Sequence, residues 1–190
     1  MESQRPIILA SGSPRRQYLM KEAGFNFRVE KPDCDESFPS EMPVNQVAHY
    51  LALKKAEAFR LKMQNEIVVT ADTVVILNNQ ILNKPQDRKE AIQMLRNLSG
   101  QTHLVMTGVC IVSKEKEESF ADTTEVSFKK LTQQEIEYYV DHYKPYDKAG
   151  AYGAQDFIGM IAIEKIIGSY FNVMGLPIHL VYQHLLRWPQ

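Results

Sequence analysis

Two arginines follow a loop of small residues near the start of the chain, and this arrangement suits phosphate binding. Ser11-Gly12-Ser13-Pro14 comes after a short apolar run, and Arg15 and Arg16 come next. We predict that Pro14 opens a helix and that Ser13 caps it. A helix N-terminus attracts anions, and guanidinium groups add paired donors for phosphate oxygens. The alternative is a capped helix with two solvated arginines, but cations there oppose the helix dipole, which favours a functional interpretation.

A carboxylate interrupts the most apolar segment of the chain. Asp72 lies at the centre of IVVTADTVVIL, residues 67–77, which we predict to be a buried strand or a strand-turn-strand. A carboxylate left unpaired in such surroundings is costly. At the carboxyl edge of a sheet, Asp72 could hold a metal ion or deprotonate water. At a strand end, it could instead accept a hydrogen bond from a neighbouring backbone group.

Further charged residues are individually weaker signals. Lys84 lies between a predicted strand and a proline, where a lysine is usually solvated but could also reach a phosphate. Lys55 lies on a predicted helix, where its stem could simply cover the edge of the apolar face. Asp33, Asp35 and Glu36 share a loop that is either a solvated acidic segment or a site for Mg²⁺.

Two glycine-containing loops follow later in the chain. In residues 147–155, small residues would let the backbone approach a ligand, and the Gln155 amide suits the edge of a uracil or thymine ring, although a flexible surface loop has the same composition. Residues 168–177 are interpreted as a structural turn before the last helix.

Composition excludes several classes of protein. The formal net charge of −1 argues against a protein that holds a nucleic acid polymer by bulk charge. Two widely spaced cysteines form neither a disulfide framework nor a zinc site. No signal peptide or membrane-spanning run is recognised, so we expect a cytoplasmic protein that does not contact a membrane. Motifs of P-loop NTPases, dinucleotide-binding enzymes, serine hydrolases and zinc proteases are absent.

The order of predicted elements indicates a mixed α/β fold. Strands and helices alternate early, and two long strands around a charged turn follow, which favours a mixed twisted sheet flanked by helices. We expect helices at residues 15–23, 44–63, 87–98, 132–143 and 177–186, and strands at 6–10, 25–30, 67–77, 80–82, 101–112, 119–128 and 161–167. No linker or repeat is recognised, so residues 1–190 are predicted to form one domain.

Taken together, these motifs resemble the Maf family of nucleotide pyrophosphatases. The resemblance rests on S-G-S-P-R-R, A-D-T, N-K-P, D-K-A-G-A-Y-G-x-Q and G-S-Y-x-N-V-x-G-L-P, in this order between residues 9 and 177. It implies two lobes with a central cleft, a relation to inosine triphosphate pyrophosphatases, and hydrolysis of a nucleoside triphosphate to the monophosphate and pyrophosphate with Mg²⁺ or Mn²⁺. Asp72 would accept the proton and Glu36 would lie in the same cleft, both as candidate metal ligands.

The resemblance also assigns substrate contacts and a subfamily. Arg16, Lys55 and Lys84 fall on positions used around the triphosphate, with Ser11 and Ser13 in the first loop and Lys84 among the catalytic candidates. Arg15, Thr73 and Gln155 match the branch that prefers dTTP and UTP. An Asp156 that follows Gln155, where glycine is common, could alter the base pocket.

Two alternative functions stay open at this point. The chain could be a 7-methyl-GTP pyrophosphatase, or a non-catalytic nucleotide-binding regulator of cell division and septum formation. The sequence leaves the oligomeric state open, with a homodimer among the options.

Overall fold

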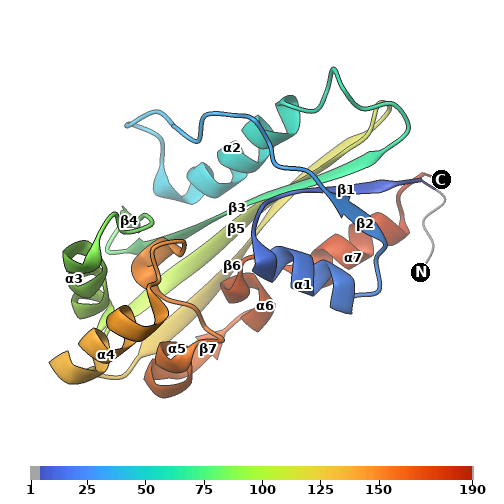
Figure 1. Cartoon of the computed structure of the whole chain (residues 1–190). Helices are drawn as coiled ribbons and strands as arrows, with labels where there is room; N and C mark the ends of the chain where they lie inside the picture. Colours follow the sequence, from blue (N-terminus) through green and yellow to red (C-terminus); the bar gives the residue numbers. More distant parts are fainter. Residues whose placement is uncertain (1–4, 190) are drawn as a thin grey trace. The chain divides into compact units, whose positions relative to one another are not determined.

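The computed structural model describes residues 5–189, which form a mixed α/β structure around one seven-stranded sheet (Figure 1). The strands are ordered β2-β1-β3-β5-β6-β7, and β4 pairs with β3. β1 (Ile7–Ala10) runs parallel to both β2 (Phe27–Val29) and β3 (Ile67–Leu77), whereas β4 (Gln80–Leu82) is antiparallel to β3. β7 (Ile163–Ile167) is antiparallel to β6 (Glu117–Phe128), and β5 (Thr102–Val112) lies between β3 and β6. The predicted mixed sheet flanked by helices is confirmed.

The chain divides into two compact units, and three of the four boundaries between them fall inside the long strands β3, β5 and β6. The first unit comprises Met1–Thr73, Thr107–Asp122 and Gly175–Gln190, and the second comprises Val74–Met106 and Thr123–Met174. The predictions of a single domain and of a central cleft stay predictions.

In the first unit, helices lie on both faces of β1 and β3. α2 (Val44–Glu57) lies on one face, whereas α1 (Pro14–Glu22) and α7 (Ile178–Leu186) lie on the other (Figure 1). The core beneath α2 is made of small and apolar side chains from the helix, the segment that follows it and the strands: Ile8, Ala10, Ala52, Ala56, Phe59, Met63, Val68, Cys110 and Val112. The three alanine side chains let the helix lie close to the strands.

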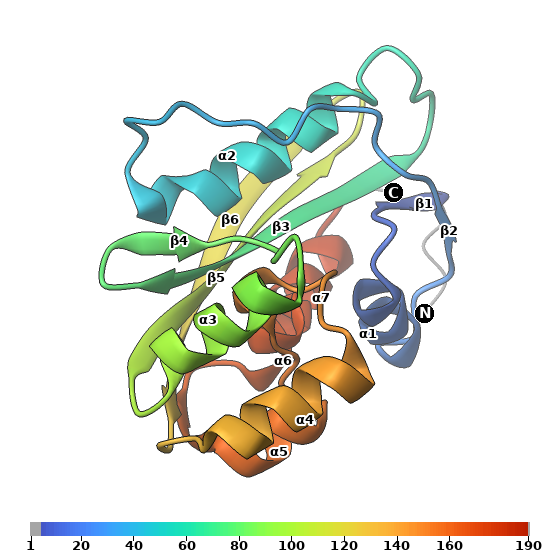
Figure 2. The same ribbon diagram turned by 60° about the vertical axis from the view of Figure 1, so that its left-hand side comes forward.

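In the second unit, α3 (Arg88–Leu98) and α4 (Gln133–Tyr143) lie side by side (Figure 2). Both helices begin with a side-chain cap: Asp87 accepts from the N–H of Glu90 at 2.8 Å, and Thr132 forms a reciprocal capping box with Glu135. The core of this unit holds Leu95, Leu98, Tyr139 and Val140. Among the residues that the structure describes, no helix is long and apolar enough to cross a membrane.

One helix end was wrongly predicted from the sequence, and three short elements were missed. The helix expected over 44–63 ends at Glu57, and the chain continues as turns. Two short helices were missed, α5 (Phe157–Ala162) and α6 (Tyr170–Met174), as was a 3₁₀ turn at Ala149–Ala151. Glycines and prolines near these helices mask the helical periodicity, and helices of five or six residues have too few turns to show it.

Candidate functional site

A lysine ammonium joins two carboxylates in the first unit. Lys55 Nζ lies 2.5 Å from Asp72 Oδ1 and 3.0 Å from Glu36 Oε1. The side chains of Lys55 and Asp72 are 7% and 13% exposed, whereas that of Glu36 is 51% exposed. The cluster therefore has a buried end at Asp72 and a solvent-facing end at Glu36. The alternative in which Lys55 only covers the edge of the apolar face is wrong.

Asp72 lies just beyond the point where β1, the parallel neighbour of β3, ends. Ala10, the last residue of β1, is paired with Thr70 of β3, so Asp72 comes two residues beyond the end of its parallel neighbour. Asp72 therefore lies beyond the carboxyl end of β1, but it is central in β3, which continues to Leu77. Strand alternation directs Asp72 and Thr70 to the same face, where Thr70 Oγ1 donates to the carbonyl of Ala52 on α2.

Close backbone packing sets the height of α2 above the sheet and hence the position of Lys55. Gly108 of β5 lies against the helix: a Cβ atom there would be 2.4 Å from the carbonyl carbon and oxygen of Ala48. Only glycine permits this approach, because the atoms that it meets are backbone atoms. Lys55, two turns after Ala48, is thereby brought to the carboxylate of Asp72.

Arg16 is held by four acceptors from three parts of the first unit. Its Nε donates to the carbonyl of Gly175 at 2.8 Å, and its Nη1 donates to the carbonyl of Ala71 at 2.8 Å and to Ser11 Oγ at 3.3 Å. Its Nη2 donates to Thr73 Oγ1 at 3.0 Å. Burial lowers the pKa of Arg16, against the opposing effect of the nearby Asp72 carboxylate. The guanidinium therefore ties the start of α1 to β3 and to the segment before α7.

Thr73 faces Arg16, on the opposite side of β3 from Asp72. Its Oγ1 lies 2.9 Å from Oγ1 of Thr107, a buried residue that the sequence analysis did not single out. It also donates to the Gly175 carbonyl at 3.3 Å. The 168–177 segment, interpreted from sequence as a structural turn, thus also supplies an acceptor to Arg16 and Thr73.

The loop before α1 differs in one detail from the sequence prediction. Ser13 occupies the N-cap position and Pro14 the first turn, but the Ser13 side chain makes no capping hydrogen bond. Instead, the N–H of Ser13 donates to Ser11 Oγ at 3.2 Å. Ser11 is buried and Arg15 is half-buried at the start of the helix. The helix start does not depend on the predicted serine cap.

Lys31 places a cation beside this loop, and the sequence analysis did not identify this lysine as a candidate. Its side chain lies against the loop, since a Cβ on Gly12 would be 2.9 Å from Lys31 Cε. Lys31 belongs to a loop that the sequence analysis treated as acidic, and a lysine 19 residues after Gly12 gives no local signal. The parallel pairing of β1 with β2 brings the two segments together.

The acidic loop contributes one of its three candidates to the cluster at Lys55. Asp35 instead accepts a hydrogen bond from the N–H of Ser37 at 3.0 Å and forms an ion pair with Lys54 at 3.3 Å. Asp33 is exposed. The structure thus distinguishes Glu36 from its acidic neighbours, which the sequence alone did not do.

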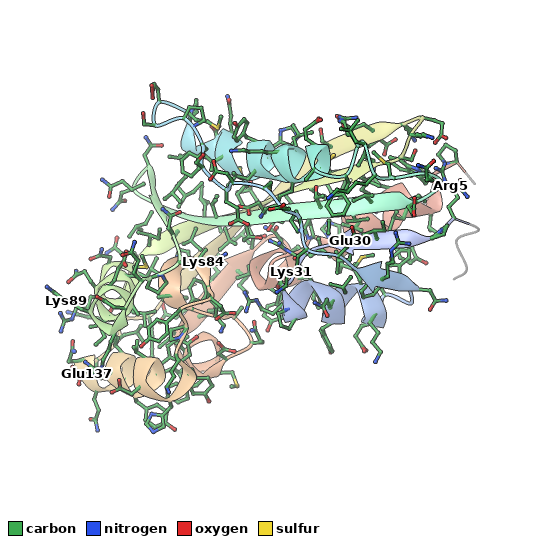
Figure 3. All side chains as sticks on the ribbon, turned by 45° about the horizontal axis from the view of Figure 1, so that its top comes forward. Arg5, Glu30, Lys31, Lys84, Lys89 and Glu137 are labelled. Atoms are coloured by element: carbon green, nitrogen blue, oxygen red, sulfur yellow. The ribbon has the colours of Figure 1, made fainter. Side chains whose placement is uncertain are left out.

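The remaining two predicted site residues, Lys84 and Gln155, belong to the second unit. Lys84 is exposed on the loop between β4 and α3 (Figure 3). Gln155 Oε1 is buried and has no hydrogen-bond partner among the described residues. Asp156 Oδ2 accepts from the Tyr139 hydroxyl at 2.8 Å, and burial, followed by this contact, raises the pKa of Tyr139. Gln155 thus presents an acceptor, whereas Asp156 has a partner within its own unit.

Glu36 and Asp72 are the two carboxylates of this site that could contact one divalent cation together. Both carboxylates reach the same ammonium nitrogen, so they lie close to each other. Residues 5–189 contain no group of three or more His, Cys, Asp or Glu side chains that could hold a metal ion. Mg²⁺ typically takes one or two protein carboxylates and completes its shell with phosphate oxygens and water. The carboxylate pair suits that arrangement and not a site built from protein ligands alone.

Comparisons with known proteins agree along nearly the whole chain. A family model described as "Maf-like protein" matches residues 6–188. A Bacteroides thetaiotaomicron protein named "dTTP/UTP pyrophosphatase" is 48% identical over 183 residues, covering 95% of each chain. Proteins of the same name from Porphyromonas gingivalis and Flavobacterium psychrophilum are each 50% identical, covering 94% and 95% of this chain and 92% and 93% of their own.

A solved structure shares the fold at low sequence identity. The HAM1 protein from Coxiella burnetii matches with a TM-score of 0.54 and 13% identity, covering 97% of this chain and 100% of that protein. At this identity, the similarity concerns the fold alone.

Proposed function

Because the chain belongs to the Maf family, we propose that it is a nucleoside triphosphate pyrophosphatase that hydrolyses dTTP and UTP to the nucleoside monophosphate and pyrophosphate. The observation that carries the proposal is the buried Asp72–Lys55 pair at the end of parallel strand β1, with Glu36 at its solvent-facing side. A lysine flanked by two carboxylates, with Arg16 from the start of α1 near Asp72, is suited to anhydride hydrolysis. The relatives named "dTTP/UTP pyrophosphatase" support the same reaction.

In the proposed mechanism, Asp72 accepts a proton from the attacking water. The contact between Lys55 Nζ and Asp72 Oδ1 fixes the orientation of the carboxylate. The N-terminus of α1, with Arg15 and Ser11 beside it, receives phosphate oxygens. A bound Mg²⁺ or Mn²⁺, held by Glu36 and Asp72, would neutralise charge on the triphosphate.

Arg16 has a supporting role beside these groups. With four internal acceptors, its guanidinium holds the first loop against β3, and it adds positive charge near Asp72. We expect Lys84 to contribute a further cation to the triphosphate.

The preference for a pyrimidine is supported by Gln155. Uracil and thymine carry an N3–H donor between two carbonyl groups, and the orphaned Gln155 Oε1 is an acceptor for it. The side-chain NH₂ can donate to a neighbouring ring carbonyl. We infer a cytoplasmic location, where these nucleotides are found, and the homodimer stays a prediction.

The test is pyrophosphate release from dTTP, UTP, CTP and 7-methyl-GTP with Mg²⁺ and with Mn²⁺. We expect release from dTTP and UTP. Preferred cleavage of 7-methyl-GTP would refute the pyrimidine preference, and tight dTTP binding without any release would refute the enzymatic proposal.

Asp72→Asn tests the proton acceptor in the same assay. The amide keeps the shape of the side chain but cannot take the proton, so we expect kcat to fall roughly 10²–10⁴-fold. Asp141→Asn is the matched control, since Asp141 lies in an exposed ion pair with Arg88 and should retain activity. If Asp72→Asn keeps wild-type turnover, Asp72 is not the proton acceptor.

A further inference from the structure

A second lysine of α2 contacts the loop that carries Glu36. Lys54 Nζ donates to the backbone carbonyl of Ser37 at 2.8 Å and contacts Asp35 Oδ2 at 3.3 Å and Ser37 Oγ at 3.5 Å. It therefore holds the residue on each side of Glu36. Lys55, the next residue of the helix, contacts Glu36 itself.

The loop needs such a tie because it has no regular secondary structure around Glu36. No helix or strand is formed between β2 and α2. Asp35 closes a local turn by accepting from the N–H of Ser37 at 3.0 Å and from its hydroxyl. The Asp35 carboxylate and the Ser37 carbonyl of this turn are both acceptors for the Lys54 ammonium on α2.

Lys54 is positioned by the helix as well as by the loop. Its side chain is 28% exposed, and its ammonium lies 6.0 Å from the centre of the Tyr50 ring, one helical turn earlier. The carbonyl of Ser37 offers it a fixed backbone acceptor.

We propose that Lys54 is a positioning residue, which clamps the Asp35–Ser37 turn to α2 and thereby places the Glu36 carboxylate at Lys55 for the reaction. The inference rests on the proposed pyrophosphatase function, in which Glu36 serves the triphosphate. In this proposal Lys54 acts through Glu36 and is assigned no contact with the substrate. Lys54 thus binds the turn, and the next residue, Lys55, binds the carboxylates of Glu36 and Asp72.

The first test is a double-mutant cycle between Lys54→Met and Glu36→Gln. Lys54→Met should lower kcat for dTTP about tenfold, as the loss of groups that orient a functional side chain typically does, with KM changing less. In the Glu36→Gln background, Lys54→Met should have no further effect. Lys54→Arg should restore most of the activity. Lys62→Met, which removes a charge from an exposed lysine beyond α2, is the matched control.

The second test measures how well the loop is held in place, and it does not depend on catalysis. Hydrogen–deuterium exchange of the free protein should show faster exchange at the amides of residues 35–38 in Lys54→Met, but not in Lys54→Arg or Lys62→Met. Asp35→Asn, which weakens the same clamp from the loop side, should show the same faster exchange.

The outcomes separate the proposals. The clamp would be overturned if Lys54→Met and Glu36→Gln lowered kcat independently of each other. It would also be overturned if Lys54→Met only raised KM and this rise depended on salt, because Lys54 would then act as a general cation. Unchanged exchange at residues 35–38 would overturn it as well. If the wild-type protein releases no pyrophosphate, the proposed function fails, while the exchange measurement still decides whether Lys54 holds the turn.

Discussion

Replacing Lys55 with methionine should destabilise the protein more than neutralising its partner Asp72. Methionine nearly matches the apolar stem of lysine, so the substitution removes mainly the ammonium. Asp72, whose side chain is 13% exposed, would lose the cation at 2.5 Å. Removing one partner of a buried ion pair typically costs about 3–5 kcal/mol, because the other charge stays desolvated.

The partial exposure of Asp72 places the expected loss in unfolding free energy near the lower end, at about 3 kcal/mol. For a chain of this length, that corresponds to a fall in Tm of roughly 6–12 °C. Asp72→Asn is less damaging, because Lys55 keeps Glu36 at 3.0 Å and the amide oxygen still accepts a hydrogen bond. We expect a loss of about 1 kcal/mol for that variant.

The assay is urea and thermal denaturation of Lys55→Met, Asp72→Asn and the double variant at one pH and salt concentration. In the double variant, no buried carboxylate loses its cation, because Glu36 is 51% exposed, so this variant should be more stable than Lys55→Met alone. Lys62→Met controls for the loss of a surface charge. Equal stability of Lys55→Met and the wild type, or a double variant less stable than Lys55→Met, would refute the idea that Lys55 neutralises a buried Asp72.

Two further predictions concern stability. Gly108→Ala should destabilise the fold by about 3 kcal/mol or more, because its Cβ would lie 2.4 Å from the backbone of Ala48. Gly12→Ala is the control: its Cβ would meet only the flexible Lys31 side chain at 2.9 Å, and it should change the free energy of unfolding by less than about 1 kcal/mol. Equal losses for the two variants in urea titrations would contradict this packing argument. Burial lowers the pKa of His103 from 6.5 to about 4, so between these values the unfolded chain binds a proton that the native protein does not, and stability falls as pH falls through this window. Between pH 7 and pH 5, the free energy of unfolding of the His103→Gln variant should fall by about 2 kcal/mol less than that of the wild type, as measured by urea titrations. If the two proteins show the same pH dependence, His103 is not responsible for it.

The local elements were predictable wherever a short stretch of sequence specifies its own structure. Pro14, Asp87 and Thr132 mark helix starts that the structure confirms, because proline geometry and capping depend on neighbouring residues. The apolar run of β3 identified a buried strand for the same reason. The short helices α5 and α6 were missed because they contain too few turns to show a period.

The sequence by itself determined which residues could carry the chemistry: an aspartate in an apolar strand, arginines at a helix start, and lysines and acids of undecided role. Only the tertiary structure decided which of them act together. It brings Lys55 to Asp72 and Glu36, assigns Lys54 to the turn beside Glu36, and ties Arg16 to Thr73. These contacts join residues that are 17 to 57 positions apart in the chain. Local spacing cannot specify them, because they follow from strand pairing and from the close approach of a helix to the sheet.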